Sequence, residues 1–311
     1  MAKFVIPSLP ELLAAGVHFG HQSRRWHPKA ADFIFTRKKD IHIIDLAKTR
    51  DALTTGCQFL YEIAKAGQPI IFVGTKRQAR EIVKKASLES GAFYVTERWL
   101  GGTLTNYDEV GKNLVKLRQL KKGLSSGEYD KYTKFEQRQL TEEAKKLEKL
   151  FGGIENLRQK PGALFVVDIK RERTVVREAE ITKTPVVAIV DTNSDPTRVA
   201  YPIPGNDDAI RSLELLVSIV GGAVKQGYQE AGVNLASSEE REPAEKLKIP
   251  VPEKSLKELD LPNRLVKSLE AAGIKSVAQL QAKSEEELSK IKGLGPKSLT
   301  SLKKAMAKLV K

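Results

Sequence analysis

Short apolar runs alternate with amphipathic stretches along residues 1–228. Four runs rich in Val, Ile, Leu and Phe have the length of buried strands, and they occupy residues 68–74, 92–96, 163–168 and 185–191. Amphipathic helical patterns follow the first and third runs, at residues 75–91 and 171–182. Apolar strands separated by such helices are typical of a parallel sheet covered on both faces. The pattern therefore predicts an α/β body.

A longer helical pattern, at residues 207–224, closes this body. Asp207 or Asp208 has the side chain that caps a helix N-terminus. Gly221 and Gly222 lie inside the pattern, and we expect this pair to interrupt or end the helix.

An arm interrupts the alternation at about residues 105–158. Its first half places Val110, Leu114 and Leu117 at steps of four and three. After a polar turn the same steps return at Leu140, Ala144, Leu147, Phe151 and Ile154. This spacing predicts an inserted antiparallel coiled-coil hairpin. Its outer faces carry many lysines, which indicate either a solvated surface or a polyanion partner.

The remaining third of the chain has a different character. Residues 229–254 contain few large apolar residues and no period, as expected of a flexible linker. Helical periodicity returns at residues 255–311, which are again basic. We therefore predict three parts: a body at 1–228, a linker at 229–254 and a small all-α domain at 255–311.

Charge narrows the range of partners. The chain has 311 residues with 53 Lys and Arg against 39 Asp and Glu, a net charge of +14. Nucleic acid is the commonest partner of so basic a protein. Cys57 is the only cysteine, which excludes an internal disulfide framework. No apolar run approaches the ~18 residues of a spanning helix, and the N-terminal segment lacks a signal-peptide core. We expect a cytoplasmic protein that binds no membrane.

The most basic short stretch is GVHFGHQSRRWHPKA, residues 16–30. Arg24 and Arg25 can bind phosphate oxygens, and Trp26 can stack on a base or pack against a neighbouring side chain. Residues 36–40, TRKKD, add further cations before an apolar strand. The chain's four histidines lack supporting cysteines and zinc-ligand spacing, so we expect no metal site; they are His18, His21, His27 and His42.

Three other segments carry candidate chemistry. VGTK, residues 73–76, follows a strand and opens a helical pattern, so Lys76 is placed to bind a phosphate. Neither a Walker A loop nor a dinucleotide glycine motif is present. ERWLGGTLTN, residues 97–106, has paired glycines that either let a ligand approach the backbone or make a turn. Asp168 and Asp191 end strands where α/β enzymes place catalytic groups, but loops also use aspartates as caps. No nucleophile–base set can be assigned.

Two proline- and aspartate-rich stretches, DTNSDP (191–196) and YPIPGNDD (201–208), are typical of loops. In the tail, residues 288–305 have the pattern helix, Gly-Leu-Gly turn, helix. Gly293 and Gly295 permit a tight reversal, and the amides after it, with Lys297 and Ser298, can bind a phosphate. This pattern predicts a helix–hairpin–helix module, which binds either nucleic acid or protein.

Several long strings in the body resemble bacterial small-subunit ribosomal protein S-two, in that family's order and across most of residues 1–228. The strings are GVHFGHQSRRWHPK, IHIIDLAKT, FVGTKRQA, ERWLGGTLTN, PGALFVVD, PVVAIVDTNSDP and YPIPGNDDAIRS. The resemblance implies a Rossmann-like parallel α/β body with an inserted coiled-coil hairpin. It also implies ribosomal RNA binding without catalysis or a cofactor, and recruitment of ribosomal protein S-one where the source has it.

The tail resembles a second family. Residues 255–308, through LKELDLPNRLVKSLEAAGI and EEELSKIKGLGPKSLTSLKKAM, are similar to the C-terminal domain of the bacterial RNA polymerase alpha subunit. That family's helix–hairpin–helix binds DNA, and the matching positions here are Arg264, Gly295, Lys297 and Ser298. Lys267 and Pro296 stand where asparagine and lysine are usual, which weakens the expectation of DNA as the ligand.

The leading hypothesis is a structural protein of the small ribosomal subunit, not a homo-oligomer, whose partners are small-subunit ribosomal RNA and neighbouring proteins, including ribosomal protein S-one. Its candidate RNA-binding residues are Arg24, Arg25, Trp26, Lys29, Arg37, Lys38, Lys76, Arg77 and Arg98. Those of the tail are Arg264, Lys267, Gly293, Gly295, Lys297 and Ser298. The alternative is a nucleotide- or phosphosugar-binding α/β enzyme that uses VGTK and Asp191. A third hypothesis concerns the tail alone, as a tethered module that contacts ribosomal RNA, DNA or protein.

Overall fold

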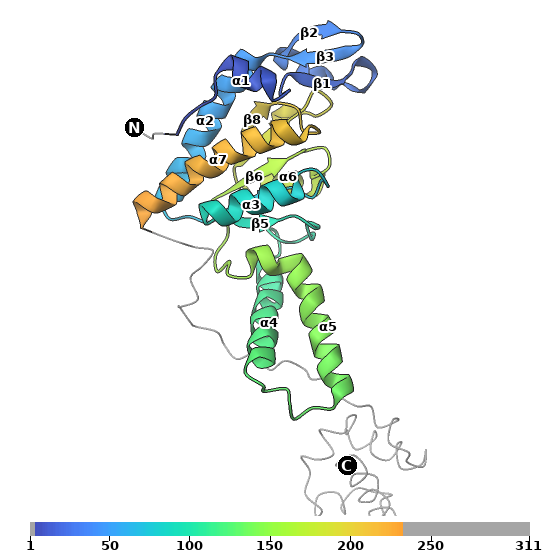
Figure 1. Cartoon of the computed structure of the whole chain (residues 1–311), viewed down its shortest axis with the longest axis vertical. Helices are drawn as coiled ribbons and strands as arrows, with labels where there is room; N and C mark the ends of the chain where they lie inside the picture. The colour runs from blue at the N-terminus through green and yellow to red at the C-terminus, as the bar shows by residue number, and fades with distance from the viewer. Residues whose placement is uncertain (1–3, 233–311) are drawn as a thin grey trace, which may run out of the picture. The chain divides into compact units, whose positions relative to one another are not determined.

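A computed structural model of the chain describes residues 4–232 (Figure 1). Its centre is a five-stranded sheet in the order β5-β4-β6-β7-β8, with every neighbouring pair parallel. The strands are β4 (Ile70–Val73), β5 (Phe93–Val95), β6 (Ala163–Val167), β7 (Val186–Val190) and β8 (Tyr201–Pro204). The parallel α/β body predicted from the apolar runs is confirmed.

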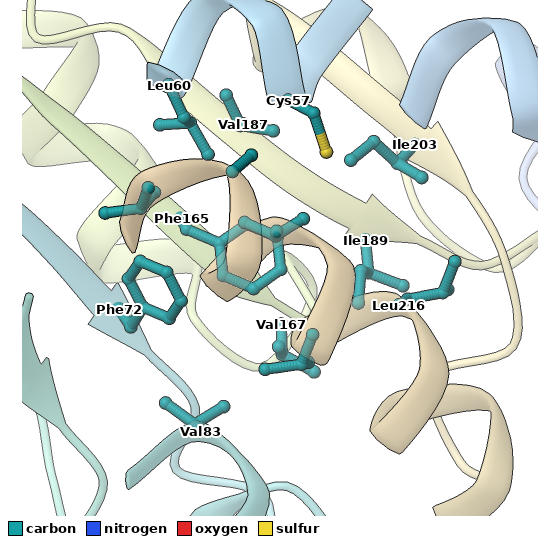
Figure 2. Packing of buried hydrophobic residues seen from close by; sticks show 14 of the residues in the cluster. Cys57, Leu60, Phe72, Val83, Phe165, Val167, Val187, Ile189, Ile203 and Leu216 are labelled. Atoms are coloured by element: carbon teal, nitrogen blue, oxygen red, sulfur yellow. The ribbon is translucent and has the colours of Figure 1, made fainter. Parts of the chain in front are cut away.

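Helices cover both faces of this sheet. Along β6, Ala163, Phe165 and Val167 pack on one face, where the core is completed by three long helices. These are α2 (Leu46–Lys65), α3 (Arg80–Ser90) and α7 (Ile210–Ala231). Figure 2 shows Phe72 of β4 and Phe165 of β6 at the centre of this core, with ring centroids 5.1 Å apart. The alternate residues, Leu164 and Val166, face α6 (Arg173–Thr182) and the base of the inserted arm.

The inserted arm is a pair of helices, α4 (Tyr107–Ser125) and α5 (Lys134–Phe151), followed by the short turn η3 (Gly152–Ile154). The helices run in opposite directions and pack on each other (Figure 1). Buried Val110, Leu114 and Leu117 of α4 lie on the predicted seam. Two lysines of the arm, Lys116 and Lys121, form ion pairs with glutamates of α5. The helical hairpin is therefore present, while coiled-coil packing along its length stays a prediction.

Residues before β4 form elements that the apolar pattern does not reveal, apart from β3. After α1 (Leu9–Ala14), a three-stranded antiparallel sheet has the order β1-β3-β2. It consists of β1 (Phe19–Gln22), β2 (Ile34–Lys38) and β3 (Ile41–Ile44), with 3-10 turns η1 (Ser23–Arg25) and η2 (Pro28–Phe33) between the first two. Asp45 caps the N-terminus of α2 by accepting hydrogen bonds from Ala47 N and Lys48 N.

Residues 201–208, expected to form a loop, begin instead with the strand β8. The turn η4 (Pro196–Arg198) precedes it. Pro202 and Pro204 lack amide hydrogens, but β8 lies at the edge of the sheet and pairs only with β7, where proline is tolerated. The loop prediction is therefore wrong for residues 201–204.

Two expectations about α7 are also wrong. The helix continues without interruption through Gly221 and Gly222 to Ala231, three residues into the expected linker. Gly221 lets α7 pack closely on α3, since a Cβ there would lie 3.3 Å from the Cβ of Ala86. Neither Asp207 nor Asp208 caps the helix: Ala209 is the N-cap residue, and Asn206 Oδ1 accepts hydrogen bonds from the amides of residues 208 and 209.

Among the helices of residues 4–232, none is long and apolar enough to cross a membrane. The predicted linker after Gly232 and the predicted domain at 255–311 lie outside the described residues.

The contact between α2 and α7 yields a prediction about stability. A Cβ on Gly227 would lie 2.6 Å from both the Cβ of Ala64 and the carbonyl oxygen of Tyr61. We expect Gly227→Ala to lower the free energy of unfolding by about 1–3 kcal/mol through overpacking. Urea unfolding followed by tryptophan fluorescence measures this loss, because both tryptophans, Trp26 and Trp99, belong to the body.

The matched control is Gly222→Ala on the same helix, where a Cβ would meet no atom within 4 Å. We expect this variant to gain up to ~1 kcal/mol from helix propensity. Equal unfolding midpoints for the two variants would contradict the close α2–α7 contact.

Candidate nucleic-acid interface

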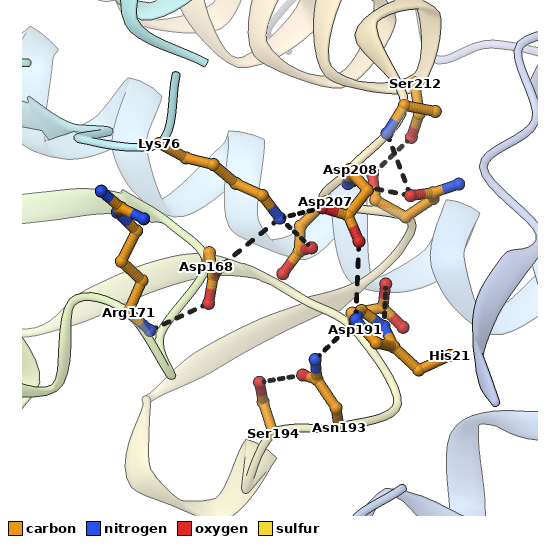
Figure 3. Close-up of polar contacts among 12 residues, drawn as sticks. His21, Lys76, Asp168, Arg171, Asp191, Asn193, Ser194, Asp207, Asp208 and Ser212 are labelled. Atoms are coloured by element: carbon orange, nitrogen blue, oxygen red, sulfur yellow. Dashed lines mark hydrogen bonds and ion pairs between the residues drawn. The ribbon is translucent and has the colours of Figure 1, made fainter. Parts of the chain in front are cut away.

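The loops that follow the five parallel strands meet at one edge of the sheet, the carboxyl edge. Residues 74–79 follow β4, residues 96–106 follow β5 and residues 168–172 follow β6. Residues 191–195 and 205–209 follow β7 and β8. Ligands of open α/β sheets bind at this edge. Figure 3 shows that its centre is occupied by a cluster of charged side chains.

Lys76 lies at the middle of that cluster. Its Nζ is 2.7 Å from Asp207 Oδ1, 2.6 Å from Asp208 Oδ1 and 3.4 Å from Asp168 Oδ2. Burial alone would lower the pKa of the ammonium, but the charge of Asp207 and the hydrogen bonds to Asp207 and Asp208 raise it overall. Lys76 therefore stays charged and links the loops after β4, β6 and β8.

Asp207 is the most buried member of the cluster, with 1% of its surface exposed. One carboxylate oxygen accepts the hydrogen bond from Lys76, while Oδ2 has no hydrogen-bond partner among residues 4–232. Burial, with the charges of Asp168 and Asp191, raises the pKa of Asp207, and Lys76 opposes that rise. The ion pair with Lys76 is thus what allows a carboxylate at this depth.

His21 joins the N-terminal sheet to the same cluster. Its Nδ1 is 3.0 Å from Asp191 Oδ2 and its Nε2 is 3.5 Å from Asp208 Oδ2. The hydrogen bond with Asp191 raises the pKa of His21, against the effect of burial. One ligand atom from each of these three residues lies within 4.8 Å of the others, so the set could hold a divalent cation. Sequence spacing could not predict this set, because its members are distant in the chain. The expectation that the histidines bind no metal stays a prediction.

Backbone contacts also attach the N-terminal sheet to the loop after β7. The amide of His21 donates to Thr192 Oγ1 at 2.9 Å, and the amide of His27 donates to the Thr192 carbonyl oxygen at 2.7 Å. Lys29 Nζ lies 2.9 Å from Asp195 Oδ2 and donates to Thr197 Oγ1. Burial would raise the pKa of Asp195, but the bonds from Lys29 and Thr197 outweigh it and lower the pKa to about 2.

A second buried carboxylate, Glu178 of α6, organises the loop after β5. Its oxygens accept hydrogen bonds from Trp99 Nε1 at 3.2 Å, from Gly102 N at 2.9 Å and from Leu104 N at 3.0 Å. Thr105 donates from both its amide and its hydroxyl at 3.4 Å. Trp99 is buried, and its bond to Glu178 anchors this loop. The only sequence signal for Glu178 is a glutamate at an apolar helix position, in VVREAEI.

Most of the candidate RNA-binding residues are exposed. Arg24 and Arg25 lie on η1, and Arg37 and Lys38 lie on β2. Trp26 is 39% exposed, and its ring lies 5.2 Å from the ring of His42. Arg77 and Arg98 lie in the loops after β4 and β5 and are also exposed.

The candidates differ in their partners. Lys76 and Lys29 are held by carboxylates as described, and Arg37 Nη2 lies 3.3 Å from exposed Asp40. Arg24 donates to Gln22 Oε1 at 3.0 Å. No carboxylate within residues 4–232 pairs with the remaining four cations, which are Arg25, Lys38, Arg77 and Arg98. The tail candidates, from Arg264 to Ser298, lie outside the described residues.

Comparison with known proteins matches two families and individual relatives. Residues 12–227 match the family described as ribosomal protein S2. Residues 239–308 match the family described as the C-terminal domain of the bacterial RNA polymerase alpha chain, a match that starts within the expected linker. A protein described as "Small ribosomal subunit protein uS2", from Roseiflexus sp. (strain RS-1), is 49% identical over 220 residues. These residues are 71% of this chain and 84% of that protein.

The Lys76 cluster yields a prediction about stability and pH. Lys76→Met leaves three carboxylates without their cation, so we expect a loss of about 3 kcal/mol in unfolding free energy at pH 7.5. Without Lys76 the pKa of Asp207 rises further. A carboxyl group whose pKa is higher in the folded than in the unfolded chain makes the fold more stable as pH falls, because the folded state then binds the proton more tightly. The loss of unfolding free energy in Lys76→Met, relative to wild type, should therefore be smaller at pH 5.5 than at pH 7.5 in urea unfolding.

Arg77→Met is the matched control, because it removes an exposed cation at the next position. Its unfolding free energy should stay within about 0.5 kcal/mol of wild type at both pH values. A Lys76→Met deficit that is the same at both pH values would show that the buried carboxylates do not cause it.

Proposed function

Because the chain belongs to the ribosomal protein S2 family, we propose that its body binds small-subunit ribosomal RNA through exposed cations on a rigid α/β scaffold. Membership makes the chain a structural constituent of the small ribosomal subunit, which serves translation in the cytoplasm, and not an enzyme.

The observation that carries the proposal is the division of cations between two roles. Lys76 and Lys29 neutralise carboxylates and hold the fold together. Arg25, Lys38, Arg77 and Arg98 are exposed and have no carboxylate partner within residues 4–232. Exposed cations that a rigid scaffold holds in place are suited to bind phosphate oxygens, which RNA presents along its whole length.

The enzyme alternative loses its main support at Lys76. An anionic substrate at VGTK would have to approach an ammonium that three carboxylates already surround, at distances of 2.6–3.4 Å. The phosphate-binding role predicted for Lys76 meets the same obstacle. We therefore assign Lys76 to the scaffold and place RNA binding on the exposed arginines and lysines.

Neighbouring ribosomal proteins are the second class of partner that we propose, including ribosomal protein S-one where it is present. The N-terminal sheet supports this assignment, because Phe19 of β1 and Phe35 of β2 are exposed large apolar side chains. Exposed aromatic residues are enriched at protein interfaces.

For the tail we propose a tethered helix–hairpin–helix module that binds nucleic acid. The support is the family match at residues 239–308 together with the sequence around Gly293, Gly295, Lys297 and Ser298. A flexible tether would raise the module's effective concentration near the body's site without fixing its orientation.

The phosphate-contact proposal predicts a strong dependence on salt. Binding of the full-length chain to transcribed small-subunit ribosomal RNA should weaken steeply between 50 and 500 mM salt, since each phosphate contact releases counterions. The double variant Arg24→Ala/Arg25→Ala should bind more weakly and reduce the slope of log Kd against log salt by about 1–2. Filter binding or fluorescence anisotropy across a salt series measures both quantities.

Lys84→Ala, on the exposed side of α3, controls for the loss of charge alone. The slope of log Kd against log salt should fall less in Lys84→Ala than in Arg24→Ala/Arg25→Ala. Equal affinity of the wild-type chain at 50 and 500 mM salt would rule out phosphate contacts as the main source of binding.

The role of the tail can be separated from that of the body by sedimentation. We expect both the full-length chain and a chain stopped after Lys254 to sediment with the small subunit in a sucrose gradient of cell lysate. That result would make the body the ribosomal anchor. Release of the shortened chain would instead show that the tail is part of the anchor, and a full-length chain that stays at the top of the gradient would contradict the ribosomal assignment.

A further inference from the structure

We propose that residues 98–105, hereafter the glycine loop, form a docking site where the sugar–phosphate backbone of RNA lies against the bare main chain of Gly101. Glu178 is the positioning residue that holds the loop in the shape that RNA meets. This inference rests on the proposed RNA-binding function and adds a specific contact to it. Binding of RNA by exposed cations does not explain the paired glycines of ERWLGGTLTN, and the proposed contact gives Gly101 a role.

Hydrogen bonds to the buried carboxylate of Glu178 hold the glycine loop in shape. Glu178 is 6% exposed, and every hydrogen bond to its carboxylate comes from the loop: from the Trp99 indole, from the amides of Gly102 and Leu104, and from Thr105. Two further backbone bonds fix the loop, one within it from Thr103 N to the Leu100 carbonyl oxygen and one from the next residue, Asn106 N, to the Gly102 carbonyl oxygen. A loop held at both ends and at its centre presents one conformation to a partner.

The two glycines of the loop differ in what the fold demands of them. Gly102 has a φ of +95°, a backbone conformation that side chains rarely adopt, so glycine is required there. Gly101 lies outside that conformational region, and a Cβ placed on it would meet no atom within 4 Å. Neither strain nor crowding within the described residues calls for glycine at position 101.

An exposed glycine with open space above it allows close approach to the main chain. Gly101 is exposed, and its amide donates no hydrogen bond to another group of residues 4–232. Backbone amides are common donors to phosphate oxygens in nucleic-acid complexes. A side chain at this position would hold a phosphate away from the amide.

Charges around the loop favour an anionic partner. Arg98 is exposed and has no carboxylate partner within residues 4–232. Neighbouring Glu97 lies 3.4 Å from Arg80 and 3.8 Å from Lys149, and Glu109 lies 2.7 Å from Lys112. Asp108, in the first turn of α4, faces the positive end of that helix. Arg98 therefore gives the loop a cation without a carboxylate partner in the described body, three positions before Gly101 in the sequence, and a cation suits a phosphate better than an apolar protein surface.

The test compares two glycine-to-alanine variants of the full-length chain. Gly101→Ala should unfold at the same urea concentration as wild type or a slightly higher one. It should bind transcribed small-subunit ribosomal RNA about tenfold more weakly, because its methyl group occupies the space of the phosphate; tenfold corresponds to ~1.4 kcal/mol. Gly222→Ala, whose added methyl group on α7 is equally free of contacts, should bind RNA as wild type does.

A double-mutant cycle tests the positioning role of Glu178. Arg98→Ala should weaken RNA binding in the wild-type chain, and it should weaken binding less in a Glu178→Gln background, where the loop is no longer held. A purely structural role for Glu178 would lower stability but leave the effect of Arg98→Ala unchanged. Additive effects of the two substitutions would overturn the positioning role.

The outcomes separate this site from the wider function. RNA affinity that survives Gly101→Ala, together with loss in Arg24→Ala/Arg25→Ala, overturns the glycine-loop contact and leaves the RNA-binding proposal standing. Absence of RNA binding by the wild-type chain contradicts both. Unchanged RNA affinity together with poor entry of Gly101→Ala into the small subunit on a sucrose gradient shows that the loop meets a protein, which also overturns the proposed contact.

Discussion

The ion pairs of Lys76 are the constraint on which the carboxyl edge of the sheet depends. One ammonium holds carboxylates from the loops after β6 and β8, and it is supplied by the loop after β4. Asp207 is too deeply buried to carry its charge without that cation. Asp208 then lies where its second oxygen reaches His21 of the N-terminal sheet. A single buried positive charge thus connects three parallel strands, the start of α7 and β1.

Contacts with this cluster and with the loop after β7 fix the position of the N-terminal sheet. His21 contacts Asp191, the amide of His27 donates to Thr192, and Lys29 pairs with Asp195, so the loop after β7 carries much of the attachment, to which Asp208 after β8 adds its contact with His21. Each of these bonds links residues more than 160 positions apart. The exposed arginines between them, Arg24 and Arg25, therefore sit on a short 3-10 turn whose two ends are anchored. Anchored cations lose less conformational entropy when they bind a phosphate than cations on a free loop do.

Local patterns predict the sheet and the hairpin but not the polar contacts between them. The runs around Ile71, Phe165 and Val187 are continuous because both faces of these strands are covered, and the seam from Val110 to Leu117 follows from helical spacing. Asp207 looked like a helix cap because a cap is a local signal, whereas its partner Lys76 lies 131 residues away. The prediction that Lys76 binds a phosphate also rests on a local signal, the strand before it and the helical pattern after it. Glu178 gave little signal, because its bonds reach 73 to 79 residues along the chain.

Net charge alone does not tell which cations are available to a partner. A count of +14 treats Lys76 and Arg98 alike, yet the first is 12% exposed among carboxylates and the second is exposed without one in the described body. The fold uses a buried lysine and a buried glutamate for the same purpose, since each fixes a loop at the carboxyl edge. In α/β enzymes that edge is where acidic side chains meet substrates. Here three of those acidic groups, Asp168, Asp207 and Asp208, are paired with Lys76, while the loop after β5 presents Arg98 and bare backbone, which is chemistry suited to a polyanion.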